Sequence, residues 1–587
     1  MARPRSTDTR RAARLWRRRH AAGLQEHRRR GEILGQYSGN GGLAGRADAA
    51  GGGGCLRKSH RRDCTRLAFY PGAQYKIDSR FATGEESRMS TKHGGVSFDV
   101  AEASIDALRR GIRSRELLVS GLIDTCLERV ERWDRAGPKL AAVLALNPRA
   151  RQLAARCDHA VADGSGGPLC GIPVAVKDNC DTAAMPTTGG CLGLRDSRPA
   201  RDSAVVRRLK DAGAIILAKT NLHELALAGL TESSLGGQTL NPYDLTRTPG
   251  GSSGGSGVAV TMGFAAAAIG TDTVNSIRSP SSANSIVGLR PTRGLISRAG
   301  IIPVSETQDA VGPLARTVFD IALLLDALAG YDPEDPATAR CIGQIPDTYT
   351  ASLQRPGLSG RRFGIIRGLQ GTSAENREVN AAVEQAIAAM RGAGAEVLSV
   401  DEPFFDAEEL IENLDVQKWE FRHLFDAYLK RLPAPPVRDL AALIASGAHL
   451  PGSLAFFKEA VGVNEPDRDP EYLRRLVAID RLRGRVFSLM AKHRLDALAY
   501  PLQRCLVVPI GSASQAQRNG ILASLIGFPA LTLPMGFSRP TPTAPIGIPM
   551  GLDLMARPFH EPLLLSIGHA FEQVTHARRA PALAREV

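Results

Sequence analysis

The stretch GGSSGGSG, residues 250–257, and the apolar run VAVTMGFAAAAIG, residues 258–270, decide how this chain folds. Three serines stand among five glycines. Such a loop is a flexible linker, a phosphate cradle, or a backbone held in an unusual shape around a serine hydroxyl. The alanine-rich run predicts a buried helix over residues 258–269, whereas a linker between domains has polar flanks.

A phosphate-binding loop fits the stretch poorly. A nucleotide P-loop needs a lysine after its last glycines, and no lysine follows Gly255. The dinucleotide pattern G-x-G-x-x-G is not matched either. The remaining interpretation is a loop in which glycines permit a positive φ and a close backbone approach, with its serines facing a chemical site.

Two further segments carry residues of chemical interest. The segment GTDTVNSIRSP, residues 270–280, places Ser276 in a turn, 24 residues after Ser252. The segment GIPVAVKDN, residues 171–179, is predicted to be an apolar strand that contains Lys177. Such a lysine either extends its amine from the strand end or buries it, and burial lowers the pKa because desolvation disfavours the ammonium form. A neutral amine can act as a general base toward a serine.

Strand and helix patterns alternate along the chain. The predicted fold class is therefore α/β: a mixed, mostly parallel twisted sheet covered by helices, with a small helical side region over about 402–480. Predicted strands cover 171–179, 214–221 and 395–400, and predicted helices cover 97–112, 113–135, 204–213, 316–330, 377–394 and 560–575. In the second of these helices the apolar face comprises Leu117, Leu118, Leu122, Ile123, Cys126, Leu127 and Val130.

The positive charge of the chain is concentrated at its start. The whole chain has 74 Lys and Arg against 60 Asp and Glu, a net charge of +14. Residues 1–95 hold 21 basic and 8 acidic residues, which leaves 53 basic and 52 acidic residues for the remainder. The body is thus nearly neutral, and its charge gives no indication of nucleic-acid binding.

The first 95 residues are predicted to be a basic, disordered extension. Four interpretations stay open: a tail without a role in the chemistry, a segment that binds nucleic acid or an anionic membrane, a transit peptide, or sequence translated from upstream of a true start at Met89. No secretory signal is recognisable, and no run of about 20 apolar residues predicts a membrane span.

Cysteine and histidine patterns predict no metal and no disulfide framework. The nine cysteines are dispersed without a CxxC pair, which is typical of free thiols in a reducing compartment such as the cytoplasm. The 12 histidines include no HExxH motif, and His223 and His560 stand alone. We therefore expect no metal and no other cofactor.

Taken together, these motifs resemble the amidase signature family. The resemblance covers GIPVAVKDN, AKTNLHELA, GGSSGGSG, GTDTVNSIRSP, the segment GLRPTRGLISRAGIIPVSETQDAVGPLART and the C-terminal ILASLIGFPALTLPMGF, from about residue 97 to 581. It implies one amidase domain over residues 96–581, with a signature core at about 165–330 and a lid-like helical region at about 402–480.

The resemblance also implies the catalytic residues. Ser276 aligns with the nucleophile, Lys177 with the base, and Ser252 with a bridging serine that follows a cis peptide bond. The preceding Gly251 offers the least steric resistance to that bond. Hydrolysis of a carboxamide would then proceed through an acyl-serine intermediate, with loss of ammonia or an amine.

Further residues are assigned supporting roles by the same resemblance. The backbone N–H groups of Thr273, Val274, Asn275 and Ser276 are expected to form the oxyanion hole. Ser253, Asp272 and Arg278 are expected to stabilise the loops, and Asp178, Asn179 and Lys219 to be structural. One departure stands out: Val274 and Asn275 occupy positions where the family usually has small residues, often glycines.

Several functions stay open at this level. The first is a stand-alone amidase, monomeric or homodimeric, that takes a small-molecule amide and requires no nucleic acid. The second is the glutamine-hydrolysing A subunit of a tRNA-dependent amidotransferase. The third is a catalytically weak, amidase-like binding protein, suggested by Val274 and Asn275. A cysteine hydrolase that uses Cys180 or Cys191 lacks a recognisable partner residue.

Overall fold

The computed structural model describes Asp99 and residues 101–585. The predicted basic extension, residues 1–95, and the alternative start at Met89 lie outside the described residues. The amidase domain boundaries therefore stay predictions, and everything below concerns the body of the chain.

One large sheet organises the body. Its eleven strands run in the order β1-β3-β2-β6-β8-β7-β12-β13-β11-β9-β10, and β4 and β5 form a separate pair. The bounds are β1 Val143–Leu146, β2 Pro173–Lys177, β3 Ile215–Thr220, β4 Glu232–Ser233, β5 Gly237–Gln238, β6 Ala267–Asp272, β7 Val287–Arg290, β8 Ala310–Ala315, β9 Arg362–Ile366, β10 Glu396–Val400, β11 Ala497–Pro501, β12 Ala530–Phe537 and β13 Pro549–Met555.

The predicted mixed sheet is confirmed, but with less parallel pairing than expected. Parallel neighbours occur in two groups, β3-β2-β6 and β11-β9-β10. The strands between these groups, together with β1, pair antiparallel. The long connections of the C-terminal half allow β12 and β13 to enter the middle of the sheet, which the local sequence pattern does not show.

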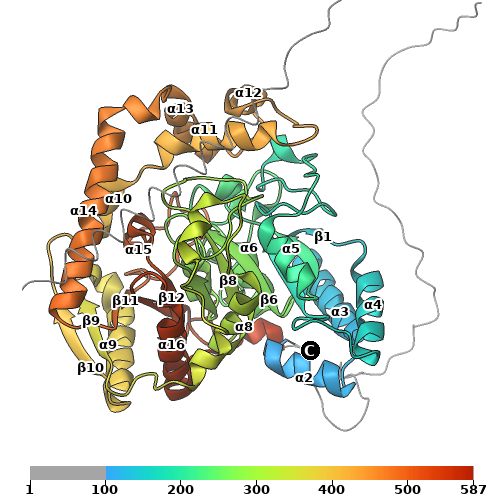
Figure 1. Cartoon of the computed structure of the whole chain (residues 1–587), viewed down its shortest axis with the longest axis horizontal. Helices are drawn as coiled ribbons and strands as arrows, with labels where there is room; N and C mark the ends of the chain where they lie inside the picture. Colours follow the sequence, from blue (N-terminus) through green and yellow to red (C-terminus); the bar gives the residue numbers. More distant parts are fainter. Residues whose placement is uncertain (1–98, 100, 586–587) are drawn as a thin grey trace, which may run out of the picture. The chain divides into compact units, whose positions relative to one another are not determined.

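Helices cover the sheet and extend beyond it (Figure 1). Their bounds are α2 Ile105–Ser114, α3 Val119–Arg129, α4 Ala150–Ala162, α5 Ala204–Asp211, α6 Gly254–Thr261, α7 Arg278–Ala283, α8 Val318–Leu328, α9 Arg377–Gly392, α10 Ala407–Leu414, α11 Gln417–Lys430, α12 Leu440–Ser446, α13 Leu454–Gly462, α14 Pro470–Lys492, α15 Ile521–Ile526, α16 Glu561–Thr575 and α17 Ala582–Arg585.

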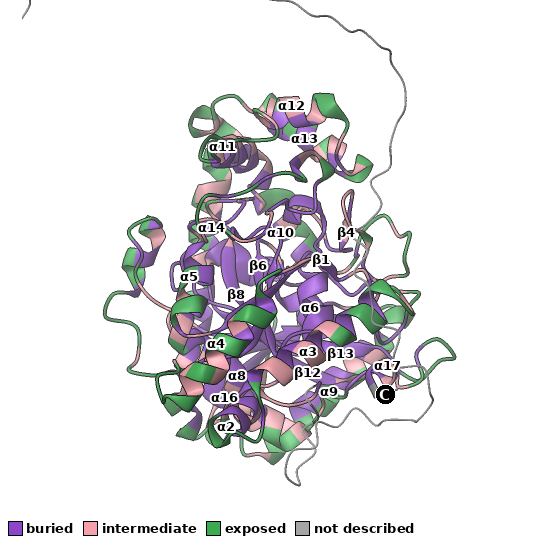
Figure 2. Ribbon diagram, turned by 90° about the vertical axis from the view of Figure 1, so that its right-hand side faces the viewer, coloured by how far each residue is buried: buried purple, intermediate pink, exposed green. Residues whose placement is uncertain are grey.

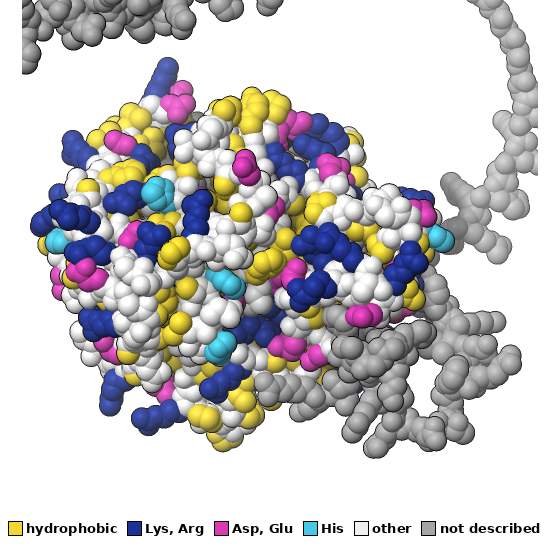
Figure 3. All heavy atoms as spheres, turned by 60° about the horizontal axis from the view of Figure 1, so that its bottom comes forward, with side chains coloured by type: hydrophobic (Ala, Val, Ile, Leu, Met, Phe, Trp, Pro, Cys, Tyr) yellow, Lys and Arg dark blue, Asp and Glu magenta, His cyan; other side chains and the backbone are white. Residues whose placement is uncertain are grey.

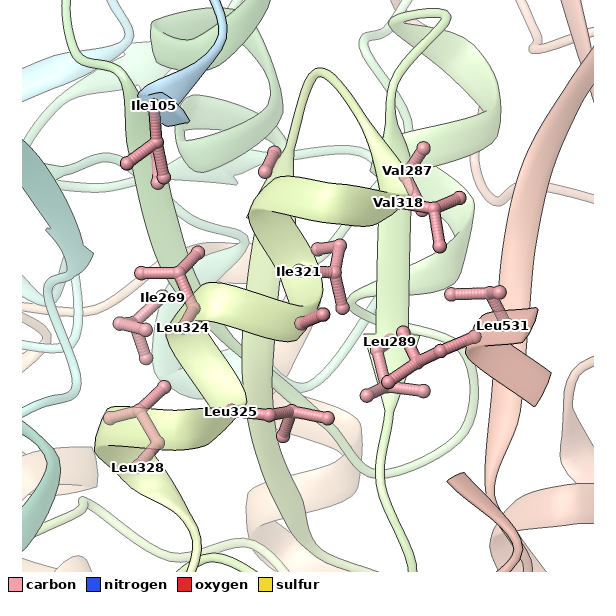
Figure 4. Packing of buried hydrophobic residues seen from close by; sticks show 14 of the residues in the cluster. Ile105, Ile269, Val287, Leu289, Val318, Ile321, Leu324, Leu325, Leu328 and Leu531 are labelled. Atoms are coloured by element: carbon pink, nitrogen blue, oxygen red, sulfur yellow. The ribbon is translucent and has the colours of Figure 1, made fainter. Parts of the chain in front are cut away.

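The largest core cluster forms where α8 packs on the sheet. Ile321, Leu324 and Leu325 of this helix pack with sheet residues such as Ile269 and Leu531 (Figure 4). Each of these side chains is fully buried. Because each such burial contributes about 1.5–3 kcal/mol, this cluster fixes α8 against the sheet. Figure 2 shows the sheet as the continuously buried centre of the body.

Strand β2 separates two clusters and so sets the direction of Lys177. Val174 and Val176 belong to the cluster around α8, whereas Ala175 packs with α6 residues on the opposite side. Side chains alternate between the faces of a strand, so Lys177 shares the face of Ala175. That face carries α6, the helix that directly follows Ser252.

Two helix predictions need correction. The expected helix over residues 258–269 is wrong, because α6 ends at Thr261 and β6 begins at Ala267. Gly263, with φ +67°, ends the helical run, and the alanines that follow pair with β2. The helix expected over residues 97–112 begins only at Ile105.

Leu118 does not belong to the apolar face that we predicted for residues 113–135. It precedes the first turn of α3 and is 56% exposed. The other positions of that face are buried or partly buried. Beyond Arg129 the helix continues as a π-helical turn, Val130–Arg135.

Five helices, α10 to α14, follow one another over residues 407–492. Part of this region packs through an aromatic cluster in which Phe421 stacks on Phe425 and Phe457. The same cluster includes Leu222 and Leu225, which lie close in sequence to His223. The helical region is thereby anchored near the segment that leads into the site described next.

Candidate active site

Lys177 ends β2 and is completely buried. Its Nζ donates hydrogen bonds to Ser252 Oγ at 2.7 Å and to Thr271 Oγ1 at 2.8 Å. Both acceptors are uncharged hydroxyl groups, and no carboxylate forms an ion pair with this amine within the described chain. Thr271 Oγ1 also accepts from Asn179 Nδ2 at 3.0 Å, which fixes its position.

The burial of Lys177 changes its protonation. Burial lowers the pKa of the amine to about 7, and the more distant Asp272 and Asp309 offset only part of this effect. At neutral pH a large fraction of the amine is therefore uncharged and can accept a proton. Geometry and electrostatics both meet the requirements of a general base.

The glycine-rich loop presents Ser252 to this amine. The peptide bond between Gly251 and Ser252 is cis, as the resemblance implies, and Gly250 has φ +71°. A Cβ on Gly251 would lie 2.8 Å from the backbone of Gly229 and from Thr231 Oγ1, so only glycine fits here. Thr231 Oγ1 donates to Gly250 O at 2.7 Å and accepts from Gly254 N–H at 3.1 Å, which holds both ends of the loop.

Ser276 lies in the turn between β6 and α7 and is 5% exposed. The turn is joined to the cis-serine loop, because Ser253 N–H donates to Ser276 O at 3.1 Å. Ser253 Oγ donates to Thr271 O at 3.3 Å. Ser253 thus connects the two loops.

A buried ionic cluster fixes the shape of this turn. The Asp272 carboxylate accepts from Ile277 N–H at 3.1 Å and from the guanidinium groups of Arg278 and Arg290 at 3.0 Å each. Burial would raise the pKa of Asp272, but the two guanidinium groups hold it well below its usual value. Arg278 also pairs with Asp553 at 2.9 Å. Asp272 and Arg278 therefore hold the turn against the neighbouring strands.

The turn leaves its backbone donors free. Arg278 Nη2 donates to Val274 O at 2.7 Å, so the Asn275 N–H of the same trans peptide unit points away from Arg278. Within the described chain, no acceptor takes up the N–H groups of residues 273–276. Consecutive free N–H groups form a site for an anion, as an oxyanion hole requires.

The departure at Val274 and Asn275 is accommodated locally. Val274 is partly buried and packs with the cluster around α14 and α15. Asn275 is 1% exposed, and a Cβ on Gly520 would lie 2.4 Å from its Cβ. Gly520 therefore leaves the space that the Asn275 side chain occupies. Neither polar atom of that carboxamide has a partner among the described residues.

A cavity of about 290 Å³ adjoins the site. Its lining includes Asn179, Thr271 and Thr273, of which Thr271 accepts a hydrogen bond from the Lys177 amine and Thr273 lies in the turn before Ser276. The loop of residues 301–306 and Leu424, Ala427 and Tyr428 of α11 line its outer part. The cavity thus connects the site with the helical region of residues 407–492.

The geometry separates structural residues from chemical ones. Lys219 forms a buried ion pair with Asp178 at 2.8 Å and donates to Thr187 Oγ1. Cys180 and Cys191 are fully buried, and burial raises the pKa of each thiol to about 12. Such thiols are poor nucleophiles, which argues against a cysteine hydrolase.

No metal site emerges from the described residues, where no three His, Cys, Asp or Glu side chains gather in a suitable cluster.

Sequence reasoning missed Thr271, Thr231, Arg290 and Asp553. Thr271 lies in the segment GTDTVNSIRSP, next to the end of β6. This position was the signal from which its role at the site could have been predicted. The other three approach the site only through long-range folding.

Comparisons with known proteins show the family of the chain. A family model described as Amidase matches residues 122–565, and the chain belongs to the amidase family. It is 32% identical over 508 residues to a probable amidase of Arabidopsis thaliana, covering 83% of this chain and 92% of that protein. It is 33% identical over 504 residues to the A subunit of a glutamyl-tRNA(Gln) amidotransferase of Synechococcus, covering 81% and 93%.

Solved structures extend the likeness to the fold. The native peptide amidase of Stenotrophomonas maltophilia superposes with a TM-score of 0.75 at 39% identity, covering 83% of this chain and 99% of that one. The amidase signature fold expected from the sequence is thereby confirmed. The chain is an amidase-type hydrolase, and its reaction is the hydrolysis of a carboxamide C–N bond.

Proposed function

We propose that Ser276 is the nucleophile, Ser252 the proton relay and Lys177 the general base of this hydrolysis. The observation that carries the proposal is the fully buried, partly neutral amine of Lys177, 2.7 Å from Ser252 Oγ. A base of this kind has its pKa near the working pH, where proton transfer is most effective.

The proposed mechanism uses the three side chains in sequence. Lys177 takes the proton of Ser252 while Ser252 takes that of Ser276, and the Ser276 Oγ attacks the amide carbonyl. The N–H groups of residues 273–276 stabilise the oxyanion. The relayed proton then passes to the leaving nitrogen, the C–N bond breaks, and a water molecule hydrolyses the acyl-serine to the carboxylic acid.

The substrate proposed is a small-molecule carboxamide whose bond is not an internal peptide bond. The cavity of about 290 Å³ beside Thr271 and Thr273 has the size for a small group and is lined by a mixture of apolar and charged residues. No cofactor has a role in this chemistry. We further propose that the protein is a monomer or homodimer. We also place it in the cytoplasm, because the seven described cysteines are free thiols, as a reducing compartment keeps them.

Among the helices that the structure describes, none is both long and apolar enough to cross a bilayer.

An amide-library screen tests the proposal. Wild type should release ammonia from simple amides, and Lys177→Ala, Ser252→Ala and Ser276→Ala should each lose activity while remaining folded, as a cooperative thermal unfolding transition would show. A serine-directed fluorophosphonate should label wild type but not Ser276→Ala. Full activity in Ser276→Ala would disprove the assignment of the nucleophile.

A second candidate is the A subunit of a glutamine-dependent amidotransferase, favoured by the likeness to the Synechococcus protein over 93% of its length. That function requires partner subunits, whereas a stand-alone amidase acts alone. On the face in Figure 3, Lys and Arg side chains are scattered with Asp and Glu among them, so this face offers no uniformly basic surface for tRNA. Activity of the purified single chain on simple amides would favour the first candidate.

The third candidate, an amidase-like binding protein, rests on Val274 and Asn275 in the turn. No acceptor among the described residues takes up the N–H groups of this turn, so these groups stay available for the proposed oxyanion hole. Fluorophosphonate labelling at Ser276 would reject this candidate.

A further inference from the structure

Two polar side chains near the cis-serine loop have no partners of their own. Arg518 is partly buried, yet its guanidinium makes no hydrogen bond or ion pair within the described chain. His223 is 6% exposed, and its Nδ1 has no hydrogen-bond partner there. A buried imidazole nitrogen is normally paired, so His223 Nδ1 points to a ligand, and a partly buried guanidinium without a protein partner is free to bind an anion beside it.

Arg518 lies close to Gly229, whose backbone packs against the cis-serine loop. A Cβ on Gly229 would lie 3.3 Å from Arg518 Nη1. The Gly229 backbone in turn lies against Gly251, the residue on the other side of the cis peptide bond. One glycine therefore separates the guanidinium from the loop that carries the proposed relay.

The segment that carries Arg518 also contacts the nucleophile turn. Gly520, two residues further on, packs against Asn275 and the Val274 carbonyl. Asn519 Nδ2 donates to Leu369 O and Pro501 O at 2.8 Å each, which anchors the segment between its two glycine contacts. Arg518 is thus held in place beside both catalytic loops.

His223 is held at the cis-serine loop by its backbone. Its backbone N–H donates to Ser252 O at 3.0 Å. Burial, with the positive charges of Arg518 and Lys177, lowers the pKa of His223 to about 4. The ring is therefore neutral at pH 7, lies close to both cations, and keeps one N–H group available for donation.

The nearest opposing charge does not neutralise Arg518. Asp415 exerts an electrostatic effect on the guanidinium, but the two form no ion pair in the described structure. The Asp415 carboxylate instead accepts from Gln417 Nε2 at 2.8 Å. A guanidinium without a carboxylate partner, beside a neutral imidazole donor, is suited to bind a carboxylate in bidentate geometry.

We propose that Arg518, assisted by His223, recognises a carboxylate on the substrate, so that the preferred substrates are carboxamides that carry an anionic carboxylate. The inference rests on the proposed function, because it names the substrate class of the same site. Hydrolysis of such an amide yields a dicarboxylate and ammonia or an amine.

Matched substrate pairs test the proposal. The anionic series consists of ω-carbamoyl carboxylates with one to five methylene groups and 4-carbamoylbenzoate. Each has a neutral partner in which an acetyl group replaces the carboxylate. For the best-fitting length, kcat/KM of wild type should exceed that of the neutral partner by about 10- to 100-fold, as hydrogen bonds to a charged group provide.

The variants separate recognition from catalysis. Arg518→Gln should abolish this preference and leave hydrolysis of the neutral partner within about twofold. Arg518→Lys should keep part of it, since lysine retains the charge without the planar fork. Arg504→Gln is the matched control, because Arg504 lies in the same segment but is paired with Glu408. It should keep the full preference.

Two results would overturn the inference: equal kcat/KM for anionic and neutral partners in wild type, or an unchanged preference in Arg518→Gln. Should Arg518→Gln fail to fold, inhibition of wild type by dicarboxylates replaces it. Dicarboxylates should bind about tenfold or more tightly than the corresponding keto acids, and equal binding would contradict the proposal.

Failure of the proposed function gives a different result. Wild type would then hydrolyse neither series, and calorimetric titration with the dicarboxylate would decide the inference by itself. Binding to wild type that Arg518→Gln loses would support the carboxylate subsite, and absence of binding to wild type would refute it.

Discussion

Two fully buried lysines lie on neighbouring strands, and their surroundings differ completely. Lys177 ends β2, and Lys219 lies on β3 opposite Val176, so the two side chains point to opposite faces of the sheet. Lys219 has a carboxylate partner, Asp178, at 2.8 Å. Lys177 has only uncharged partners among the described residues: the hydroxyl groups of Ser252 and Thr271 and, at 3.5 Å, the Thr271 carbonyl.

The difference shows how one fold makes a structural cation and a base from the same residue type. A carboxylate at ion-pair distance favours the charged form of an amine, whereas burial beside neutral groups favours the uncharged form. Accordingly, burial lowers the pKa of Lys177 to about 7. Exchanging the roles of the two residues would therefore require a change of partners.

The largest effect should follow from removal of the base. Lys177→Met should lower kcat by about 10⁴-fold, as loss of a relay member does in other hydrolytic triads. The measurement is amide hydrolysis by purified protein. Lys219→Met provides the control, because its folded fraction should keep activity within about tenfold. A Lys177→Met variant with at least a tenth of wild-type activity would contradict the base assignment.

The second-largest predicted effect is the loss of stability when the ion pair between Lys219 and Asp178 is broken. Lys219→Met should destabilise the fold by about 3–5 kcal/mol, since Asp178 would remain buried without its partner. Denaturant unfolding at pH 7 measures this effect. The double variant Lys219→Met/Asp178→Asn should recover part of the loss, and a single variant as stable as wild type would show that the pair has no structural role.

Lys177→Met should change stability in the opposite direction. The unfolded chain binds a proton at Lys177 up to about pH 10.5, whereas the folded chain binds it only below about pH 7. Wild-type stability due to this group therefore rises with pH between these values. At pH 7 the variant should be more stable by about 1–3 kcal/mol after the loss of two hydrogen bonds.

This advantage of Lys177→Met should shrink toward pH 10. Denaturant unfolding of both proteins from pH 7 to 10 provides the test. A variant less stable than wild type throughout this range would show that the amine is not forced to be neutral.

The smallest predicted effect is the pH dependence of kcat in the wild-type protein. With a pKa of about 7, the neutral fraction of Lys177 rises about tenfold from pH 6 to pH 8, and kcat should rise with it. Ammonia release at saturating amide measures the profile. A flat profile over this range would count against an amine base.

The sequence predicted the elements that carry local signals. Lys177 stood out as a lysine in an apolar strand, and the strand and helix patterns around it correspond to β2, α5 and β3. The glycine-rich loop and its cis peptide bond followed from family resemblance, and Gly251 indeed has no room for a side chain.

Other features depended on contacts that local sequence does not encode. The alanine run of residues 265–268 has the propensity of a helix, yet residues from Ala267 onward form β6, because pairing with β2 and β8 satisfies both of its edges. Arg290 and Asp553 reach the nucleophile turn from distant strands. Local sequence also does not reveal that Arg518 lacks a hydrogen-bond or ion-pair partner among the described residues.

The most direct test of the central claim is the rate of phosphonylation by a fluorophosphonate as a function of pH, with the adduct located by peptide mass spectrometry. The account predicts a single adduct on Ser276, a rate that rises with a midpoint near pH 7, and loss of this rise in Lys177→Met. An adduct on another residue, or a midpoint near the ordinary lysine pKa of about 10.4, would contradict it.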